Sequence, residues 1–210
     1  MIKHAVLDVV ETSNLILREI RASDAGDLSC FMTQARYQKH IVHRLKDETE
    51  VKDFVRRQIA HQGDSRRRLF HLSAEERMSA EVIGDGFLIH HPDQSVEIGW
   101  GLHPALWSMG FGTEIGRALL AIGIERLKAK RVWCKIMRPN TASVVQPMGA
   151  GSKLASICSR AAWSGPTNGG ASGAASSMVV SWLPIPMAGG RWVLRTMLQS
   201  KACMARTLST

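Results

Sequence analysis

Apolar and polar positions alternate, or recur with helical spacing, along the first two-thirds of the chain. Alternation over residues 15–20 predicts a strand, and the N-cap pair Ser23-Asp24 before helically spaced apolar residues predicts a helix. The other predicted elements are a helix starting at Asp47 or Thr49, strands over 69–72, 81–89 and 96–102, a helix over 113–129 and a strand over 131–137. The order β-α-α-β-β-β-α-β indicates one α/β unit.

The pattern stops after Ser143. Pro147 and two nearby glycines interrupt any helix there, and residues 144–210 contain 10 Ala, 10 Ser and 8 Gly. Such a composition supports little packed core. We therefore divide the chain into an ordered portion, residues 1–143, and a tail, residues 144–210, in which Met178–Leu183 and Trp192–Leu198 are compatible with either strands or helices.

The formal net charge of +9 arises mainly in this tail. All 18 acidic residues lie at or before Glu125, whereas residues 144–210 hold six of the 27 Lys and Arg. Residues 1–143 are left with 21 basic and 18 acidic side chains, a net of +3, which is ordinary for an enzyme. The tail also lacks an aromatic-basic pattern, so binding to nucleic acid is weakly supported.

Segments that would indicate secretion, membrane insertion or metal binding are missing from the sequence pattern. There is no run of about 18 apolar residues, and the N-terminus lacks the apolar core of a signal peptide. The four cysteines are widely spaced without a C-x-x-C pair, which argues against a zinc ribbon or disulfide scaffold. We expect a reduced, cytoplasmic protein without a metal; the oligomeric state, a homodimer included, is left open.

A glycine loop offers the most informative chemistry. An extended segment ends at Pro104, a loop follows at 108–112, and a helix is predicted from Thr113. Glycines let the backbone approach an anion, and the unpaired N–H groups and dipole of a helix N-terminus favour negative charge. This arrangement predicts a phosphate site, although an ordinary glycine turn before a helix is the alternative.

The residues around the loop resemble the GNAT acetyltransferase superfamily, within it the ribosomal-protein N-terminal acetyltransferases. The superfamily loop reads Arg/Gln-x-x-Gly-x-Gly/Ala, and residues 107–112 read Trp-Ser-Met-Gly-Phe-Gly, with Trp usual at the first position in this branch. Met109 stands where a polar or basic residue is frequent. Further matches bring the resemblance to roughly residues 11–144; they are Leu15–Arg18, Glu97–Trp100, Arg131-Val132 and Pro139–Ser143.

The resemblance implies an α/β (α+β) fold with a mixed, mostly antiparallel twisted sheet flanked by helices. It also implies transfer of an acetyl group from acetyl-CoA to a primary amine, on a protein N-terminus or a small molecule, by direct attack on the thioester. Acetyl-CoA would be the cosubstrate, without a metal.

By the same resemblance, backbone groups would hold the cosubstrate. Trp100 and Leu102 would bind the pantetheine arm, with the Leu102 N–H facing the acetyl carbonyl, and Asn140 would lie near the arm. Plain sheet pairing is the alternative for both strand residues, because their backbone groups become available only if the strand diverges from its neighbour. The pyrophosphate would be cradled by the N–H groups of Met109, Gly110, Phe111, Gly112 and Thr113.

Two side chains are the catalytic candidates. Glu97 would be the general base, directly or through water, because an alkylammonium with a pKa near 10 must lose a proton before attack. Ser143 would hydrogen-bond or protonate the departing thiolate. The alternative for Glu97 is a carboxylate in a salt bridge on an edge strand, and the alternative for Ser143 is a helix cap. Four further residues are given structural roles: His90, His91 and His103 as turn or surface residues, and Cys134 in the core.

The tail limits this interpretation. The family expects a helix with Lys-Leu-Gly-Phe and then two strands after Ser143, whereas this chain continues Val144–Gly149. One hypothesis is a frameshift near codons 144–146, which would make the chain a non-catalytic or unstable product. The other hypothesis is a divergent C-terminus that still folds.

Overall fold

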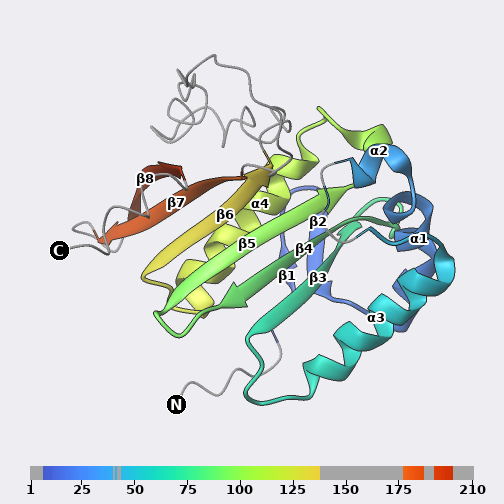
Figure 1. The fold of residues 1–210 in the computed structure, drawn as a ribbon, viewed down its shortest axis with the longest axis horizontal. Helices are drawn as coiled ribbons and strands as arrows, with labels where there is room; N and C mark the ends of the chain where they lie inside the picture. The colour runs from blue at the N-terminus through green and yellow to red at the C-terminus, as the bar shows by residue number, and fades with distance from the viewer. Residues whose placement is uncertain (1–6, 40, 42–43, 138–176, 187–191, 201–210) are drawn as a thin grey trace, which may run out of the picture.

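One twisted sheet forms the centre of the molecule (Figure 1). The computed structural model describes residues 7–39, 41, 44–137, 177–186 and 192–200. Eight strands follow one another across the sheet in chain order: β1 (Val10–Glu11), β2 (Leu15–Glu19), β3 (Leu69–Glu76), β4 (Val82–His90), β5 (Ser95–Leu102), β6 (Arg131–Met137), β7 (Ser177–Pro186) and β8 (Trp192–Ser200). All neighbours pair antiparallel except β5 and β6, which are parallel.

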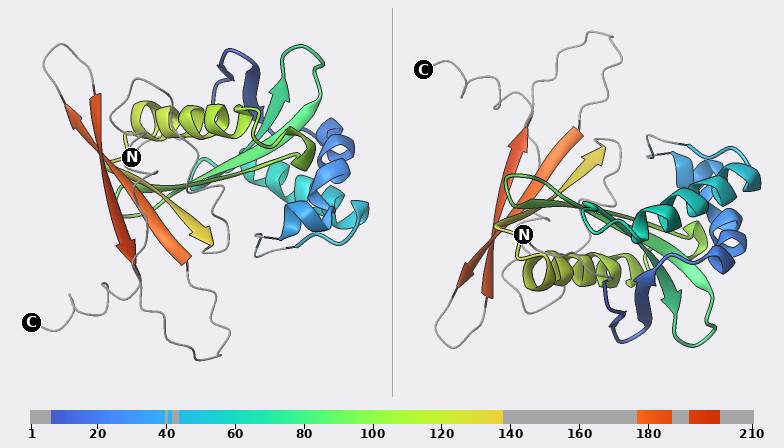
Figure 2. Two further views of the ribbon diagram at one scale, coloured as in Figure 1. Left: turned by 90° about the horizontal axis from the view of Figure 1, so that it is seen from above. Right: turned by 90° about the horizontal axis from the view of Figure 1, so that it is seen from below.

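Helices cover both faces of this sheet (Figure 2). Helix α4 packs on one face, where Leu119 fills the space above Gly86, and a buried apolar cluster joins it to β2–β6. The first three helices form a second buried cluster on the other face. The helices, with their single-turn extensions, are η1 (Ala22–Asp24), α1 (Ala25–Met32), α2 (Ala35–Gln38), α3 (Glu48–Gln62), η2 (Pro104–Leu106), α4 (Phe111–Ala121) and the π turn η3 (Ile122–Arg126).

The mixed sheet flanked by helices confirms the predicted fold class. The eight elements expected between residues 15 and 137 are all present, in the expected order. Helix α4 begins two residues earlier than predicted and ends in a π turn, in which the Leu127 N–H donates to the Ile122 carbonyl at 3.0 Å. Three features were not predicted: β1, the short helix α2, and the pairing of β7 with β6 and β8.

The arginine run 66–68 suggests a solvated loop from its charge alone, but its central residue is buried. Arg67 is buried, its guanidinium forms an ion pair with Glu19 of β2, and it lies 4.5 Å from the centroid of the Phe70 ring. A buried guanidinium requires such a partner because an unpaired charge in the interior is costly. The partner is 48 positions away in the sequence, so a local pattern does not reveal it.

Candidate functional site

Strands β5 and β6 separate after a short stretch of pairing. Their parallel register covers Ser95–Glu97 and Arg131–Trp133, although β5 continues to Leu102 and β6 to Met137. On its other edge β5 stays paired with β4 as far as Leu102. The two strands thus diverge from Glu97 onward, which is the divergence that the sequence alone could not show.

Alternate residues of β5 direct their backbone groups into this gap. The hydrogen bonds from His91 N to Ser95 O and from His103 N to Ile83 O, both 2.8 Å, show that odd-numbered residues pair with β4. Backbone groups alternate in direction along a strand. The N–H groups of Ile98, Trp100 and Leu102 therefore point to the side on which β6 has diverged.

The glycine loop lies at the end of this gap. Gly110 caps α4 with φ of +95°, a left-handed conformation that side chains disfavour, and residues 108–110 are exposed. The Met109 N–H donates to Leu106 O at 3.4 Å, and the Thr113 N–H donates to Gly110 O at 3.0 Å. The N–H groups of Phe111 and Gly112 belong to the first helical turn and have no carbonyl one turn earlier within the helix. These donors suit an anion.

Contacts with the β1–β2 turn fix the start of α4. The Glu114 carboxylate accepts hydrogen bonds from Thr12 Oγ1 at 2.5 Å, from the Asn14 backbone N–H at 2.7 Å and from Asn14 Nδ2 at 2.9 Å. Burial alone would raise the pKa of Glu114, but these hydrogen bonds outweigh burial and lower it. The helix N-terminus is thereby held in place beside the loop.

Trp107 connects the loop to the end of β5. Its indole N–H donates to the Leu102 carbonyl at 2.9 Å. The Arg36 guanidinium of α2 lies over its ring, 4.8 Å from the centroid. Trp107 thus keeps one third of its surface exposed while bridging α2, β5 and the loop.

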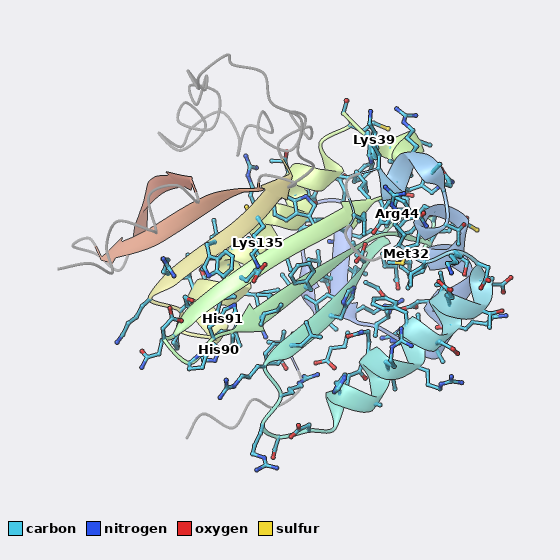
Figure 3. All side chains as sticks on the ribbon, in the orientation of Figure 1. Met32, Lys39, Arg44, His90, His91 and Lys135 are labelled. Atoms are coloured by element: carbon cyan, nitrogen blue, oxygen red, sulfur yellow. The ribbon has the colours of Figure 1, made fainter. Side chains whose placement is uncertain are left out.

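Glu97 lies where β5 and β6 part, and its carboxylate is buried. Lys135 of β6 places Nζ 3.1 Å from Oε1, and His91 places Nε2 3.6 Å from Oε2. The His91 ring stacks on Trp133 with 5.5 Å between centroids. Figure 3 labels both partners over this part of the sheet. The salt bridge of the alternative interpretation is present, but it does not exclude a role as a base.

The remaining residues that the sequence analysis singled out have different outcomes. Asn140 and Ser143 lie outside the described residues, so their roles stay predictions. Cys134 is buried, as expected. His103 caps η2, its Nδ1 accepting from the Ala105 N–H at 3.1 Å. His91, by contrast, is not a plain surface residue: its Nε2 is buried beside Glu97.

A polar network on the α1–α3 face was missed by the sequence. Asp85 accepts a hydrogen bond from the Tyr37 hydroxyl at 2.8 Å and lies 3.0 Å from His71 Nε2. Burial and the Asp85 carboxylate raise the pKa of Tyr37 well above its ordinary value. The hydroxyl sits against Gly101, where an added Cβ would lie 2.1 Å away. No local sequence pattern connects Tyr37, His71 and Asp85, which only the folded structure brings together.

The described part of the chain contains no cluster of three metal-ligating side chains and no helix long and apolar enough to span a membrane.

Comparisons with known proteins address the fold and the family. The profile of the acetyltransferase (GNAT) domain matches residues 14–148. The fold is similar to a putative ribosomal-protein-serine acetyltransferase from Vibrio cholerae (19% identity, 70% of this chain and 84% of that one, TM-score 0.61). It is also similar to the ribosomal-protein-S5-alanine acetyltransferase from Vibrio fischeri (12% identity, 70% of this chain and 85% of that one, TM-score 0.58). A spermidine N-acetyltransferase chimera from Vibrio cholerae and hSSAT has a similar fold as well (16% identity, 63% of this chain and 76% of that one, TM-score 0.52).

Proposed function

Because the chain belongs to the GNAT acetyltransferase family, we propose that it transfers an acetyl group from acetyl-CoA to a primary amine, on a protein N-terminus or a small molecule. The observation that carries this proposal is the divergence of β5 from β6 directly after Glu97, in line with the α4 N-terminus. Backbone donors for a long anionic cosubstrate and a buried carboxylate then border one gap.

The loop and helix supply the pyrophosphate site. Gly110 is exposed, and the first-turn N–H groups of Phe111 and Gly112 point along the helix axis with its positive dipole end. Met109 and Thr113 complete the loop, although their N–H groups already donate to Leu106 and Gly110. The binding of phosphate oxygens therefore rests mainly on the three central residues.

From the spacing along β5 we infer that the thioester carbonyl binds at Trp100 rather than at Leu102. A strand rises about 3.3 Å per residue, so the Cα of Glu97 lies about 17 Å from that of Leu102 and about 10 Å from that of Trp100. A carboxylate cannot serve an amine attacking at the farther position through one or two waters. We assign the Trp100 N–H to the carbonyl and the Leu102 N–H to the pantetheine arm.

Glu97 then removes the proton that blocks attack. The acceptor ammonium gives its proton to Glu97 through water, and the freed amine attacks the carbonyl carbon, whose developing negative charge the Trp100 N–H stabilises. The C–S bond then breaks, and the departing thiolate takes up the second proton of the attacking nitrogen, which leaves a neutral amide and the CoA thiol. Ser143 is the predicted hydrogen-bond donor to this thiolate. Lys135 of β6 lies 3.1 Å from the Glu97 carboxylate and so holds it at the point where the two strands part.

An acceptor panel tests this function. Purified full-length protein is mixed with acetyl-CoA and either peptides with free N-terminal Ser or Ala, or spermidine, because similar folds act on both kinds of amine. The proposal expects release of CoA thiol and a mass increase of one acetyl group on at least one acceptor. A chain that binds acetyl-CoA but modifies none of these acceptors would contradict the proposed function.

The alternative is a non-catalytic product of a frameshifted acetyltransferase gene. The acid-free composition of residues 144–210 favours it. Sequencing the gene across codons 138–155 distinguishes the two, because a frameshift predicts that another frame continues Ser143 into a helix with Leu-Gly-Phe and two strands.

A further inference from the structure

The His91 ring is held against Glu97 without a hydrogen bond. Its Nε2 is buried, has no hydrogen-bond partner among the described residues, and lies 3.6 Å from Glu97 Oε2. That distance exceeds a hydrogen bond. Stacking on Trp133 fixes the ring, while a third of the side chain remains open to solvent. A buried polar atom without a partner is costly and calls for an explanation.

Two acceptors facing each other account for this geometry. An ionised carboxylate can only accept, and a neutral imidazole that carries its proton on Nδ1 presents a lone pair at Nε2. The two atoms then cannot form a hydrogen bond. A proton on Oε2 would convert Glu97 into a donor and satisfy both groups at once. The pair is therefore complementary to protonated Glu97, the state that exists just after a base has taken a proton.

We propose that His91 is a positioning residue that accepts from Glu97 the proton taken from the amine and passes it to solvent. This inference rests on the proposed function. The N–H bond of the ammonium breaks as Glu97 gains an O–H bond; that O–H bond then breaks as His91 Nε2 gains an N–H bond. The imidazolium loses its Nδ1 proton to water at its exposed edge, so the ring ends neutral with one proton on Nε2 and Glu97 ends ionised. A further exchange with water, which takes the Nε2 proton and returns one to Nδ1, restores the tautomer that accepts the next proton.

The charges around the ring fit this role. Lys135 faces Glu97 from β6, with its Nζ 4.9 Å from the Trp133 ring centroid. Asp93, in the β4–β5 turn, accepts hydrogen bonds from Ser95, which lower the pKa of Asp93 and keep it anionic. Arg131 lies 3.6 Å from Asp93. The His91 ring thus has the Glu97 carboxylate beside it and is close enough to the Asp93 carboxylate to lower the pKa of Asp93, and both negative charges favour a transient imidazolium.

Chemical rescue tests the inference. His91→Ala removes the ring and leaves a space beside Trp133 that free imidazole can enter. The rate of CoA release with the acceptor found in the panel is expected to fall about 10- to 100-fold, within the range of acid–base effects, and to recover with added imidazole. His91→Asn should be slow but not rescued, because its side chain occupies the space. His61→Ala, on the exposed side of α3, is the matched control and should keep the wild-type rate.

The outcomes separate the inference from the function beneath it. An unchanged rate in both His91 variants, or a loss that imidazole does not restore in His91→Ala, overturns the proton transfer through His91 while acetyl transfer stands. If Glu97→Gln retains the wild-type rate, Glu97 is not the base and the role of His91 fails with it. Wild-type protein that acetylates no acceptor would overturn the proposed function and this inference together. As a control for binding, acetyl-CoA should raise the melting temperature of wild type and of His91→Ala by the same amount, because the substitution does not touch the cosubstrate site.

Discussion

Replacing Gly101 with Ala should disrupt the hydrogen bond between Tyr37 and Asp85, which lies against β5. A Cβ at this position would lie 2.1 Å from the Tyr37 hydroxyl and 2.7 Å from Asp85 Oδ1, so the hydroxyl must move away. Its 2.8 Å hydrogen bond to Asp85 then breaks. The substitution therefore combines overpacking with a buried carboxylate that has lost a donor.

The magnitude follows from these two effects. Overpacking costs about 1–3 kcal/mol, and a buried polar group left without its partner costs about 1–3 kcal/mol. Together they predict a loss of about 2–6 kcal/mol in the free energy of unfolding. For a chain of this size each kcal/mol lowers Tm by about 2–4 °C, which gives a decrease of about 4–24 °C.

Urea unfolding followed by circular dichroism measures the change. Gly26→Ala is the matched control, because a Cβ at Gly26 of α1 meets no atom within 4 Å and alanine favours a helix; it should be neutral or stabilise by up to about 1 kcal/mol. If Gly101→Ala unfolds at the same urea concentration as wild type or Gly26→Ala, the close contact between Tyr37 and β5 is refuted.

Three further predictions concern the loop, the base and acid stability. Gly110→Val, which forces a branched side chain into φ of +95°, should abolish the stabilisation by acetyl-CoA; an unchanged shift would refute the loop assignment. Glu97→Gln should slow acetyl transfer about 100-fold or more without weakening acetyl-CoA binding, as measured by initial rates and calorimetry. Burial raises the pKa of Asp24, but hydrogen bonds from Arg18 and Ser73 outweigh it and lower that pKa, so Asp24 stabilises the fold above the unfolded pKa of about 3.9. The stability difference between wild type and Asp24→Asn should therefore be largest near neutral pH and shrink as the pH falls below about 4, and a constant difference would contradict the ion pair.

Local patterns predicted most of the fold because the elements up to residue 137 obey local rules. The strand over 96–102 alternates, and Gly110 marks the start of α4. The helix begins earlier than predicted because Gly110 itself acts as N-cap. Helix α2 escaped prediction because four residues are too few to show a period.

Contacts between strands could not be predicted in the same way. Glu97 meets Lys135 because β5 and β6 are parallel over three residue pairs, and no hairpin fixes that register in the sequence. Tyr37 meets Asp85 across 48 residues, and Arg67 meets Glu19 across the same separation. The pattern therefore supplied candidate site residues but not the side chains that surround them.

Acetyl-CoA binding by the full chain tests the central claim most directly. A cooperative thermal melt with increasing acetyl-CoA should show a saturable rise in Tm. At a concentration of 100 times Kd the stabilisation is about 2.7 kcal/mol, which corresponds to about 5–11 °C. That rise, lost in Gly110→Val, is the predicted result. A cooperative melt that does not move with millimolar acetyl-CoA or CoA would contradict a cosubstrate site between β5, β6 and the α4 N-terminus.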